Sequence, residues 1–378
     1  MVQEKRLVQQ FFELVQVDSE SGNEGEISGV LKNRLQELGL TVTEDNAKQI
    51  TGHGANNLFA ILEATDDAKD QPTILFTCHM DTVTPGNGIK PQIGEDGYIR
   101  SDGTTILGSD DKAGIAALLE AIQIIKESNA SHARVQVVIT VGEESGLLGA
   151  RAIDPAMLEA TYGYALDSNG DIGDIAVAAP TQAHVVIEIF GKSAHAGVSP
   201  EKGISAIQVA AKSISAMKLG RIDEETTANI GKFEGGGPTN IVCDYVKLTA
   251  EARSIKQEKL DAQVAHMKQA VEETVAKFGA TSKFRSKIVY PAYEHTVDSD
   301  VVKLASRAIT AIGATPRTFH SGGGSDANVF NGLGVPTVNL AVGYEHIHTT
   351  QEQIKVENLV KTAQLVVELI KQSAQFKA

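Results

Sequence analysis

Five short segments of the sequence place histidine or acidic side chains directly beside apolar runs. They contain His79 with Asp81, Asp110 with Asp111, Glu143 with Glu144, Asp167, and His346 with His348. Each segment alone has an ordinary explanation, such as a capped strand end or a carboxylate at a helix N-terminus. Their recurrence favours one site, and its residue types, His, Asp and Glu without thiolate, are typical of divalent metal ligands.

The charges of these side chains suit two metal ions. Asp110, Glu144 and Asp167 supply three negative charges, so two divalent cations and one bridging hydroxide bring the sum to zero. Two adjacent glutamates repel each other unless a cation lies between them. Glu143 is not needed in this charge sum, so it is left over as a general acid and base. Asp81 follows His79 closely enough to accept the second N–H of a metal-bound imidazole. The pattern therefore predicts a two-metal hydrolase site.

The elements that must hold these side chains alternate between short apolar runs and amphipathic helices. Periodicity predicts strands over 73–78, 135–141 and 162–166 and helices over 5–17, 25–38 and 113–126. A helix over 300–312, a strand over 336–342 and a closing helix over 352–372 follow later. This rhythm predicts an α/β domain with a mostly parallel sheet flanked by helices, and it places the acidic segments at the carboxyl ends of strands, where ligands bind.

The rhythm changes in the middle of the chain. Residues 184–190, 204–217, 228–233, 245–252, 257–278 and 282–290 read as strand, helix, strand, strand, helix, strand, which is the ferredoxin-like order. We therefore predict an α/β domain formed by residues 1–179 and 294–378. A ferredoxin-like α+β domain, residues 180–293, is inserted into it.

Composition excludes several classes of protein. The chain has 378 residues, with 34 Lys and Arg against 48 Asp and Glu, a formal net charge of −14 that would repel nucleic acid and anionic lipid. The amphipathic start and the absence of a long apolar run predict a cytoplasmic protein without a membrane partner. Cys78 and Cys243 lie far apart in apolar runs and are expected to be buried thiols.

Seven motifs together resemble the M20 metallopeptidases, and within them the peptidase T-like branch. The resemblance covers essentially the whole chain and rests on FTCHMDTV (76–83), LGSDDKAGIAA (107–117), VGEESGLLGA (141–150), the Asp167 segment, GKSAHAG (191–197), GGGSDANVF (322–330) and IHTTQE (347–352). It implies a zinc exopeptidase-like fold with an inserted lid and a cis peptide bond at Asp110–Asp111. It also implies two divalent ions, expected to be zinc, although cobalt and manganese suit the same ligands.

The resemblance assigns individual roles. His79, Asp110 and Asp167 would hold one ion, and Asp110, Glu144 and His348 the other. His348 fits the family pattern His-Thr-x-x-Glu better than His346. Three further side chains would be catalytic, with Glu143 as general base, Asp81 orienting His79, and His195 reaching the oxyanion from the lid. The implied substrate-binding residues are Asn240, Arg253, Gly323 and Ser325.

These assignments favour an exopeptidase that removes the N-terminal residue of di- and tripeptides, with a metal-bridging water as nucleophile. The nearest alternatives are an N-acyl-amino-acid amidohydrolase or a carboxypeptidase of the same family. A catalytically silent binding protein would have no use for Glu143, and a phosphate-binding protein would rest on the glycine-rich loop alone. The resemblance also implies a homodimer formed through the lid.

Overall fold

The computed structural model describes residues 1–376, and the chain divides into two compact units. Unit 1 comprises residues 1–178, 295–321 and 325–378, and unit 2 comprises residues 179–294 with 322–324. Unit 2 is thus an insertion between two parts of unit 1. Each unit has its own apolar core.

Unit 1 carries most of a nine-stranded mixed sheet, whose strand β14 falls within the residue range of unit 2. Its strands run in the order β1-β2-β6-β3-β7-β16-β8-β14, with β15 paired to β8. The central pairs β3–β6, β3–β7 and β16–β7 are parallel, while β1–β2, β2–β6 and β16–β8 are antiparallel. The strands are β1 (Thr41–Glu44), β2 (Leu58–Leu62), β3 (Ile74–His79), β6 (Val135–Thr140), β7 (Tyr162–Ser168), β8 (Asp174–Ala179), β14 (Tyr293–Glu294), β15 (Arg317–His320) and β16 (Thr337–Ala341).

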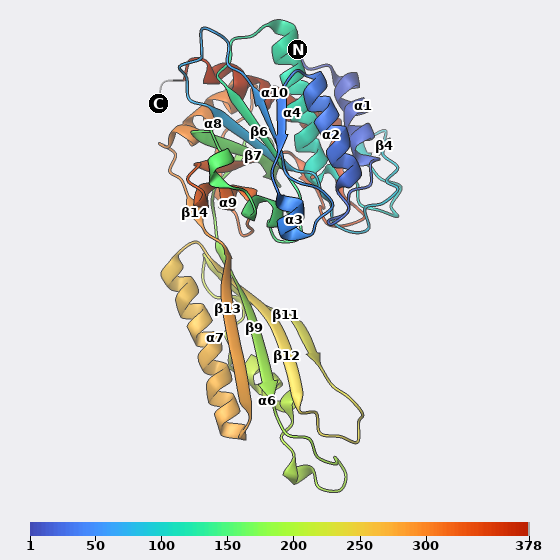
Figure 1. Cartoon of the computed structure of the whole chain (residues 1–378), viewed down its shortest axis with the longest axis vertical. Coiled ribbons are helices and arrows are strands. Elements are labelled where there is room, and N and C mark those ends of the chain that lie inside the picture. The colour runs from blue at the N-terminus through green and yellow to red at the C-terminus, as the bar shows by residue number, and fades with distance from the viewer. Residues whose placement is uncertain (377–378) are drawn as a thin grey trace. The chain divides into compact units, whose positions relative to one another are not determined.

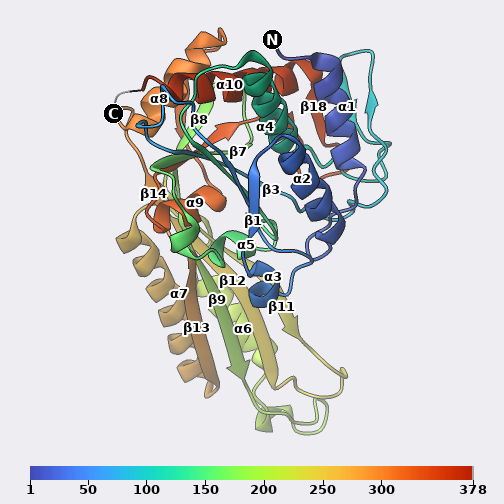
Figure 2. The ribbon, with the colours of Figure 1, turned by 45° about the horizontal axis from the view of Figure 1, so that its top comes forward.

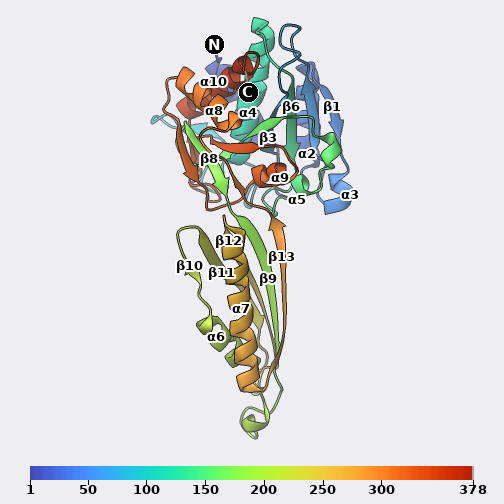
Figure 3. The ribbon, with the colours of Figure 1, turned by 90° about the vertical axis from the view of Figure 1, so that its left-hand side faces the viewer.

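The central strands are buried on both faces because helices cover both sides of the sheet. Helices α1, α4, α8 and α10 pack against one another, and Figures 1 and 3 show α4, α8 and α10 on one face with α5 and α9 on the other. An Arg34–Glu13 ion pair joins α1 to α2, which lie side by side in Figures 1 and 2. The helices are α1 (Glu4–Val15), α2 (Gly25–Glu37), α3 (Ala47–Thr51), α4 (Ser109–Ser128), α5 (Leu148–Arg151), α8 (Asp300–Ala311), α9 (Asp326–Gly332) and α10 (Val356–Ser373).

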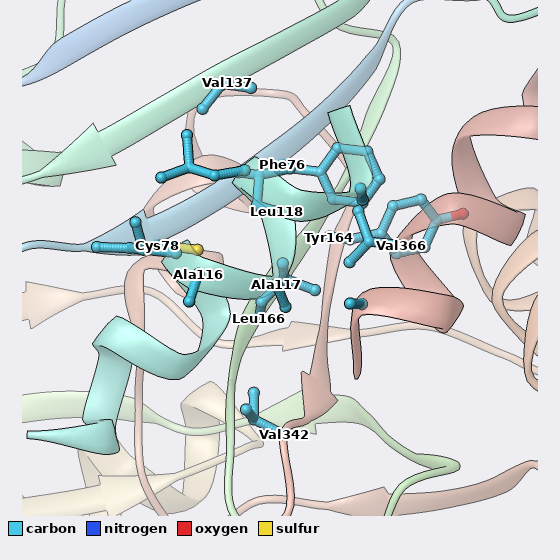
Figure 4. Packing of buried hydrophobic residues seen from close by; sticks show 14 of the residues in the cluster. Phe76, Cys78, Ala116, Ala117, Leu118, Val137, Tyr164, Leu166, Val342 and Val366 are labelled. Carbon is cyan, nitrogen blue, oxygen red and sulfur yellow. The ribbon is translucent and has the colours of Figure 1, made fainter. Parts of the chain in front are cut away.

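The core beneath the site is packed from these two layers. Figure 4 shows Phe76 of β3 and Tyr164 of β7 among side chains of α4 and α10, such as Leu118 and Val366. The two rings lie 5.8 Å apart between centroids, and the Tyr164 hydroxyl donates to the Val301 carbonyl. Burial of this apolar surface is the main force that fixes the central strands, and with them the positions at their ends.

A small antiparallel sheet corrects one sequence expectation. Its order is β17-β18-β5-β4, with β4 (Gln92–Ile93), β5 (Tyr98–Arg100), β17 (Tyr344–Glu345) and β18 (Gln353–Lys355). The closing helix was predicted to begin at residue 352 but begins at Val356, because residues 353–355 pair with β5. Glu352 consequently lies in the turn before β18.

Unit 2 is a ferredoxin-like α+β domain, as the sequence predicted. Its antiparallel sheet has the order β10-β11-β12-β9-β13, and α6 and α7 pack against each other and against the strands (Figures 1 and 2). Its elements are β9 (Thr181–Phe190), α6 (Ala206–Ala216), β10 (Gly220–Arg221), β11 (Thr226–Gly235), β12 (Tyr245–Ser254), α7 (Gln257–Phe278) and β13 (Thr281–Tyr290).

The two cysteines differ from each other. Cys78 is buried on β3, as expected, but Cys243 is only partly buried, and its thiol lies 3.2 Å from the Tyr245 carbonyl. The expectation of a buried Cys243 was wrong, because the residue lies in the loop that precedes β12 rather than inside a strand. In residues 1–376, no helix is both long and apolar enough to cross a membrane.

Candidate metal centre

Three neighbouring strands bring acidic and histidine side chains to one edge of the unit 1 sheet. His79 is the last residue of β3, Asp167 lies near the end of β7, and Glu143 and Glu144 follow β6. Because β3 is parallel to both β6 and β7, the carboxyl ends of all three strands meet. The sheet topology therefore gathers side chains from positions far apart in the sequence.

Asp110 lies between two imidazoles and faces each with a different carboxylate oxygen. Its Oδ1 is 3.1 Å from His79 Nε2, and its Oδ2 is 3.2 Å from His348 Nε2. His79 Nε2 is also 3.6 Å from Asp167 Oδ1, and His348 Nε2 is 2.9 Å from Glu144 Oε1. A carboxylate placed in this way can bind one cation with each oxygen, which is the bridging role expected of Asp110.

The same geometry offers one alternative ligand. Ligand atoms of His79, Asp110 and Glu144 lie within 4.8 Å of one another, and so do those of His79, Asp111 and Asp167. Asp111 is fully buried, and its Oδ2 accepts a hydrogen bond from the backbone N–H of His79. This places the Asp111 carboxylate against the backbone of β3, whereas Asp110 faces the imidazoles. The Asp110–Asp111 peptide bond is cis.

The two imidazoles of the site are strongly basic. Burial alone lowers the pKa of His79, but its hydrogen bonds to Asp110 and Asp167 outweigh this effect and raise the pKa well above its usual value. Hydrogen bonds to Asp110 and Glu144 raise the pKa of His348 to about 10. Each ring therefore lies in a field of negative charge that favours a positive partner.

The surroundings of several acidic side chains disfavour their charged form. Burial raises the pKa of Asp167 to about 7, with the nearby Asp110 as the next contribution. Burial and neighbouring carboxylates likewise raise the pKa of Glu143 and of Asp111 well above the usual range. The fold thus holds several carboxylates closer together than their charges favour. Divalent cations bound among them would remove that repulsion, so the donor set fits a metal centre.

Asp81 organises two parts of the site at once. Its backbone carbonyl lies 2.9 Å from His79 Nδ1, which leaves Nε2 of that ring directed at Asp110. Its carboxylate accepts hydrogen bonds from the backbone N–H groups of Glu143 and Glu144, at 3.0 and 3.3 Å. Ser21 donates a further hydrogen bond to the same carboxylate, at 2.6 Å. Asp81 therefore orients His79 mainly through its backbone and positions the glutamate pair through its side chain.

Two residues that sequence reasoning did not single out hold Asp167. Tyr344 donates its hydroxyl to Asp167 Oδ1 at 3.1 Å. The Asn339 amide accepts from the Asp167 backbone N–H, at 3.0 Å, and donates to the Asp167 carbonyl, at 2.8 Å. This double contact replaces backbone pairing where the register of β16 and β7 shifts. A polar residue inside the apolar strand 337–341 is the sequence signal that could have identified Asn339.

The predicted lid residues lie in unit 2. His195 is exposed, and its Nδ1 accepts hydrogen bonds from the backbone N–H groups of Gly197 and Val198, both at 3.2 Å. In the neutral ring the proton is therefore on Nε2, which is available as a donor. Asn240 lies beside His195, since its carbonyl accepts from the Ala196 N–H and residues 195 and 241 form an isolated bridge.

Arg253 lies at the other end of unit 2. It is on β12 opposite Gln182, whereas the His195 loop follows Phe190 at the far end of β9. Eight residues at about 3.3 Å per residue separate these two ends by about 26 Å. The Arg253 guanidinium forms a two-point ion pair with Glu251, at 2.9 and 3.0 Å. The structure therefore brings Asn240 to His195 but does not bring Arg253 to either.

The glycine-rich segment that contains Gly323 and Ser325 is packed within the protein as well as offering candidate contacts to a substrate. Gly323 belongs to unit 2, and a Cβ on its neighbour Gly324 would lie 2.3 Å from the Tyr290 ring. Ser325 is buried in unit 1, where it begins α9 in a capping box with Asn328 and accepts from Asn339. The Ser325 hydroxyl thus already has partners within the protein.

Comparison with known proteins identifies the family of this chain. The sequence profile described as peptidase family M20/M25/M40 matches residues 75–372, which include every predicted metal ligand. The chain belongs to this family. YqjE of Bacillus subtilis is 57% identical over 99% of this chain and 100% of its own length. Peptidase T of Geobacillus thermodenitrificans is 28% identical over 97% of this chain and 98% of its own length.

Two solved structures extend the M20 assignment to the whole fold. Aminopeptidase PepT from Bacillus cereus is 57% identical, has a TM-score of 0.92, and is matched over 99% of this chain and all of the other. A tripeptidase from Staphylococcus aureus is 48% identical, has a TM-score of 0.96, and is matched over the full length of both chains. The resemblance to the peptidase T-like branch of the M20 family, drawn from the motifs, is confirmed.

Proposed function

We propose that this protein is a two-metal aminopeptidase that removes the N-terminal residue from di- and tripeptides. The observation that carries the proposal is the position of Asp110, whose two oxygens face His79 and His348 beside the glutamate pair. The names of its whole-length relatives, an aminopeptidase and a tripeptidase, support the substrate class. We also propose a cytoplasmic location for it.

The ligands divide into two sets that share one carboxylate. His79, Asp110 and Asp167 would hold one ion, and Asp110, Glu144 and His348 the other. A structural relative of the same family, a Bacillus subtilis protein with 18% identity, is described as a dinuclear metal-binding peptidase, which supports two ions here. Zinc, cobalt and manganese all suit these nitrogen and carboxylate ligands.

When bound, the ions would polarise the scissile carbonyl and lower the pKa of the attacking water. Burial and neighbouring carboxylates raise the pKa of Glu143 well above its usual range, the direction that suits a carboxylate that takes up and returns a proton. We assign it the proton of the attacking water, which it then delivers to the leaving amine. Asp81 keeps this carboxylate in place through the backbone N–H groups of residues 143 and 144.

His195 would donate a hydrogen bond from its Nε2–H group to the oxyanion that develops on the carbonyl. Asn240, which lies beside it, would contact the same substrate from unit 2. Gly323 would approach the substrate with its backbone. The hydroxyl and the backbone N–H of Ser325 are both bonded within the protein, so Ser325 would contact the substrate only after one of these bonds is exchanged. Arg253 would bind a substrate carboxylate after exchange of its ion pair with Glu251.

Product analysis by mass spectrometry tests the proposed activity. The metal-loaded protein is incubated with one tripeptide, offered with a free amino terminus and as its N-acetyl derivative. We expect loss of the first residue from the free peptide alone. Release of acetate from the blocked peptide would instead establish a deacylase, and loss of the last residue from either peptide would establish a carboxypeptidase.

A further inference from the structure

Glu352 is a buried glutamate that reaches from the segment of His348 to the loop of Asp110. Its side chain is 2% exposed, and it lies 242 residues beyond Asp110 in the sequence. Neither the expected ligand sets nor the assigned catalytic groups include it. Its hydrogen bonds nevertheless all lead to the loop that carries the bridging aspartate.

The carboxylate of Glu352 accepts four hydrogen bonds from four consecutive residues. Its Oε2 accepts from the backbone N–H groups of Leu107 and Gly108, both at 2.8 Å. Its Oε1 accepts from the Ser109 hydroxyl at 2.6 Å and from the Asp110 N–H at 3.1 Å. Four donors use the full acceptor capacity of an ionised carboxylate, so no shorter or neutral side chain can reproduce this contact.

The opposite end of the same short segment carries His348. The Glu352 N–H donates to the Thr349 carbonyl, and the Thr349 hydroxyl donates to the His346 carbonyl, so residues 346–352 form an internally bonded turn. One turn therefore holds a ligand of the second metal set and the anchor of the bridging ligand. The 3.2 Å between His348 Nε2 and Asp110 Oδ2 depends on both.

We propose that Glu352 is a positioning residue that fixes Asp110 and His348 relative to each other for metal binding. This inference rests on the proposed two-metal function. The simpler explanation is that Glu352 only caps the N-terminus of α4, whose first residues it binds. A cap stabilises the fold, whereas a positioning residue also sets metal affinity, so the two explanations differ in a measurable quantity.

Cobalt binding separates them. Wild-type protein and the Glu352→Gln variant are freed of metal and titrated with Co²⁺, followed by calorimetry and by the visible absorption of the bound ion. In Glu352→Gln an NH₂ group replaces one of the two oxygens and faces at least one backbone donor in either orientation. We expect the Kd of the more weakly bound ion to rise about 10- to 100-fold, the usual effect of losing a hydrogen-bond partner that supports a metal ligand. Unchanged Kd values for both ions would overturn the proposal.

Two further variants keep the result interpretable. Glu120→Gln is the matched control, because Glu120 is equally buried and binds Arg6 and the Gln3 N–H, remote in the fold from the ligands. It should lower the melting temperature and leave both Kd values unchanged. Equal losses of affinity in Glu120→Gln and Glu352→Gln would reduce Glu352 to a stabilising cap and overturn the proposal.

If Glu352→Gln does not fold, Ser109→Ala decides, since it removes one of the four donors and adds no repulsion. A rise in Kd of at least threefold is expected, and an unchanged Kd overturns the proposal.

Failure of the proposed function gives a different result. A wild-type protein that binds two Co²⁺ but leaves both dipeptides and tripeptides intact lacks the proposed activity, while the ratio of its Kd values to those of the variants still decides the role of Glu352.

Discussion

Asp110 owes its bridging position to the residues around it as much as to its own chemistry. Its two oxygens are directed at different imidazoles because His79 comes from the end of β3 and His348 from the segment before β18. Hydrogen bonds from these imidazoles outweigh the effect of burial and hold the pKa of Asp110 well below its usual range. The carboxylate is therefore ionised and ready to bind cations across the physiological pH range.

Replacement of Glu143 tests the assignment of the general base. Glu143→Gln keeps the size of the side chain but cannot accept a proton, and it should lower kcat by about 10²- to 10⁴-fold. Metal content should stay at the wild-type value, because Glu143 belongs to neither ligand set. Steady-state kinetics with a tripeptide and elemental analysis measure the two quantities. Glu37→Gln, on the exposed side of α2, is the control, and near-normal turnover of Glu143→Gln would refute the mechanism.

The raised pKa values of the imidazoles predict that metal affinity increases with pH. His348, with a pKa of about 10, and His79, with a pKa well above its usual value, both carry a proton at pH 7 in the metal-free protein. A metal ion binds the neutral imidazole through its unprotonated nitrogen, so binding must release the extra proton of each charged ring. Metal affinity should then rise about tenfold per pH unit for each proton released, until the pH reaches the pKa of that imidazole in the folded, metal-free protein.

Calorimetry in buffers of different ionisation enthalpy counts the released protons. The variant His348→Asn should release one proton fewer than wild type. The same shift predicts that His348 stabilises the metal-free fold fully below its unfolded pKa of about 6.5. That stabilisation is lost as the pH rises toward about 10. Metal binding that releases no protons would show that the imidazoles are not ligands.

At the scale of elements, the loop after β6 positions the glutamate pair through close backbone contacts. The Gly149 N–H donates to the Val141 carbonyl at 3.0 Å, and Asn57 bonds to both residues, which closes the loop on itself. A Cβ on Gly149 would lie 2.1 Å from that carbonyl oxygen and 2.5 Å from Asn57 Oδ1. The loop can therefore close only with glycine at position 149.

Gly149→Ala should accordingly destabilise unit 1 by about 1–3 kcal/mol, the usual cost of overpacking. It should also lower kcat, because the loop that opens carries Glu143 and Glu144. Urea unfolding and tripeptide kinetics measure the two effects. Gly29→Ala is the control, since Gly29 lies in α2 with nothing within 4 Å of its added Cβ, and it should stabilise by about 0.5–1 kcal/mol. Equal effects of both substitutions would contradict this account of the loop.

The sequence predicted those elements whose burial pattern is periodic and long. The three central strands and α1, α2, α8 and unit 2 lie within a few residues of their expected positions. The small sheet was not predicted, because strands of two or three residues carry no alternation that could be recognised. The start of α10 was misplaced for the same reason. The helical pattern of residues 352–372 includes the three residues of β18, which instead pair with β5.

The candidate metal ligands were predictable from the sequence, because metal binding depends on residue type. The positions of His79, Asp110, Glu144 and Asp167 at strand and helix ends follow from the order of elements. The polar side chain of Asn339 inside an apolar strand could mark that residue, but its partner, like those of Tyr344 and Glu352, was not predictable, because each contact is a hydrogen bond between segments more than 170 residues apart. Such pairs exist only once the sheet has formed, and one sequence alone does not reveal them.

At the scale of the whole molecule, the length of unit 2 bears on how a substrate is bound. Arg253 pairs with Gln182 at one end of β9, and His195 lies in the loop that follows Phe190 at the other end, with about 26 Å between the two ends by the rise of a strand. A tripeptide spans at most about 11 Å when fully extended. One copy of unit 2 therefore cannot contact the same tripeptide with both residues. If both act on one substrate, they come from two subunits, as the predicted homodimer would allow.

Complementation between inactive variants tests this arrangement. His195→Ala and Glu143→Ala should each be nearly inactive as separate proteins. In a mixed dimer, one site combines Glu143 of the first subunit with His195 of the second, and that site is intact. Random exchange of equal amounts makes half of the dimers mixed, with one intact site of two, so about a quarter of wild-type turnover should return.

Tripeptide hydrolysis measured before and after mixing under conditions that allow subunit exchange gives the answer. Each variant mixed with itself is the control for activation by the exchange procedure. A mixture of His195→Ala with Glu37→Gln, in place of Glu143→Ala, reports the effect of dilution. Turnover that stays at the level of the separate variants, although the untagged variant co-purifies with an affinity-tagged copy of the other, would mean that each site takes His195 and Glu143 from the same chain. In that event Arg253, at the opposite end of the strands, would have to act away from the substrate, and Glu251 would be its permanent partner.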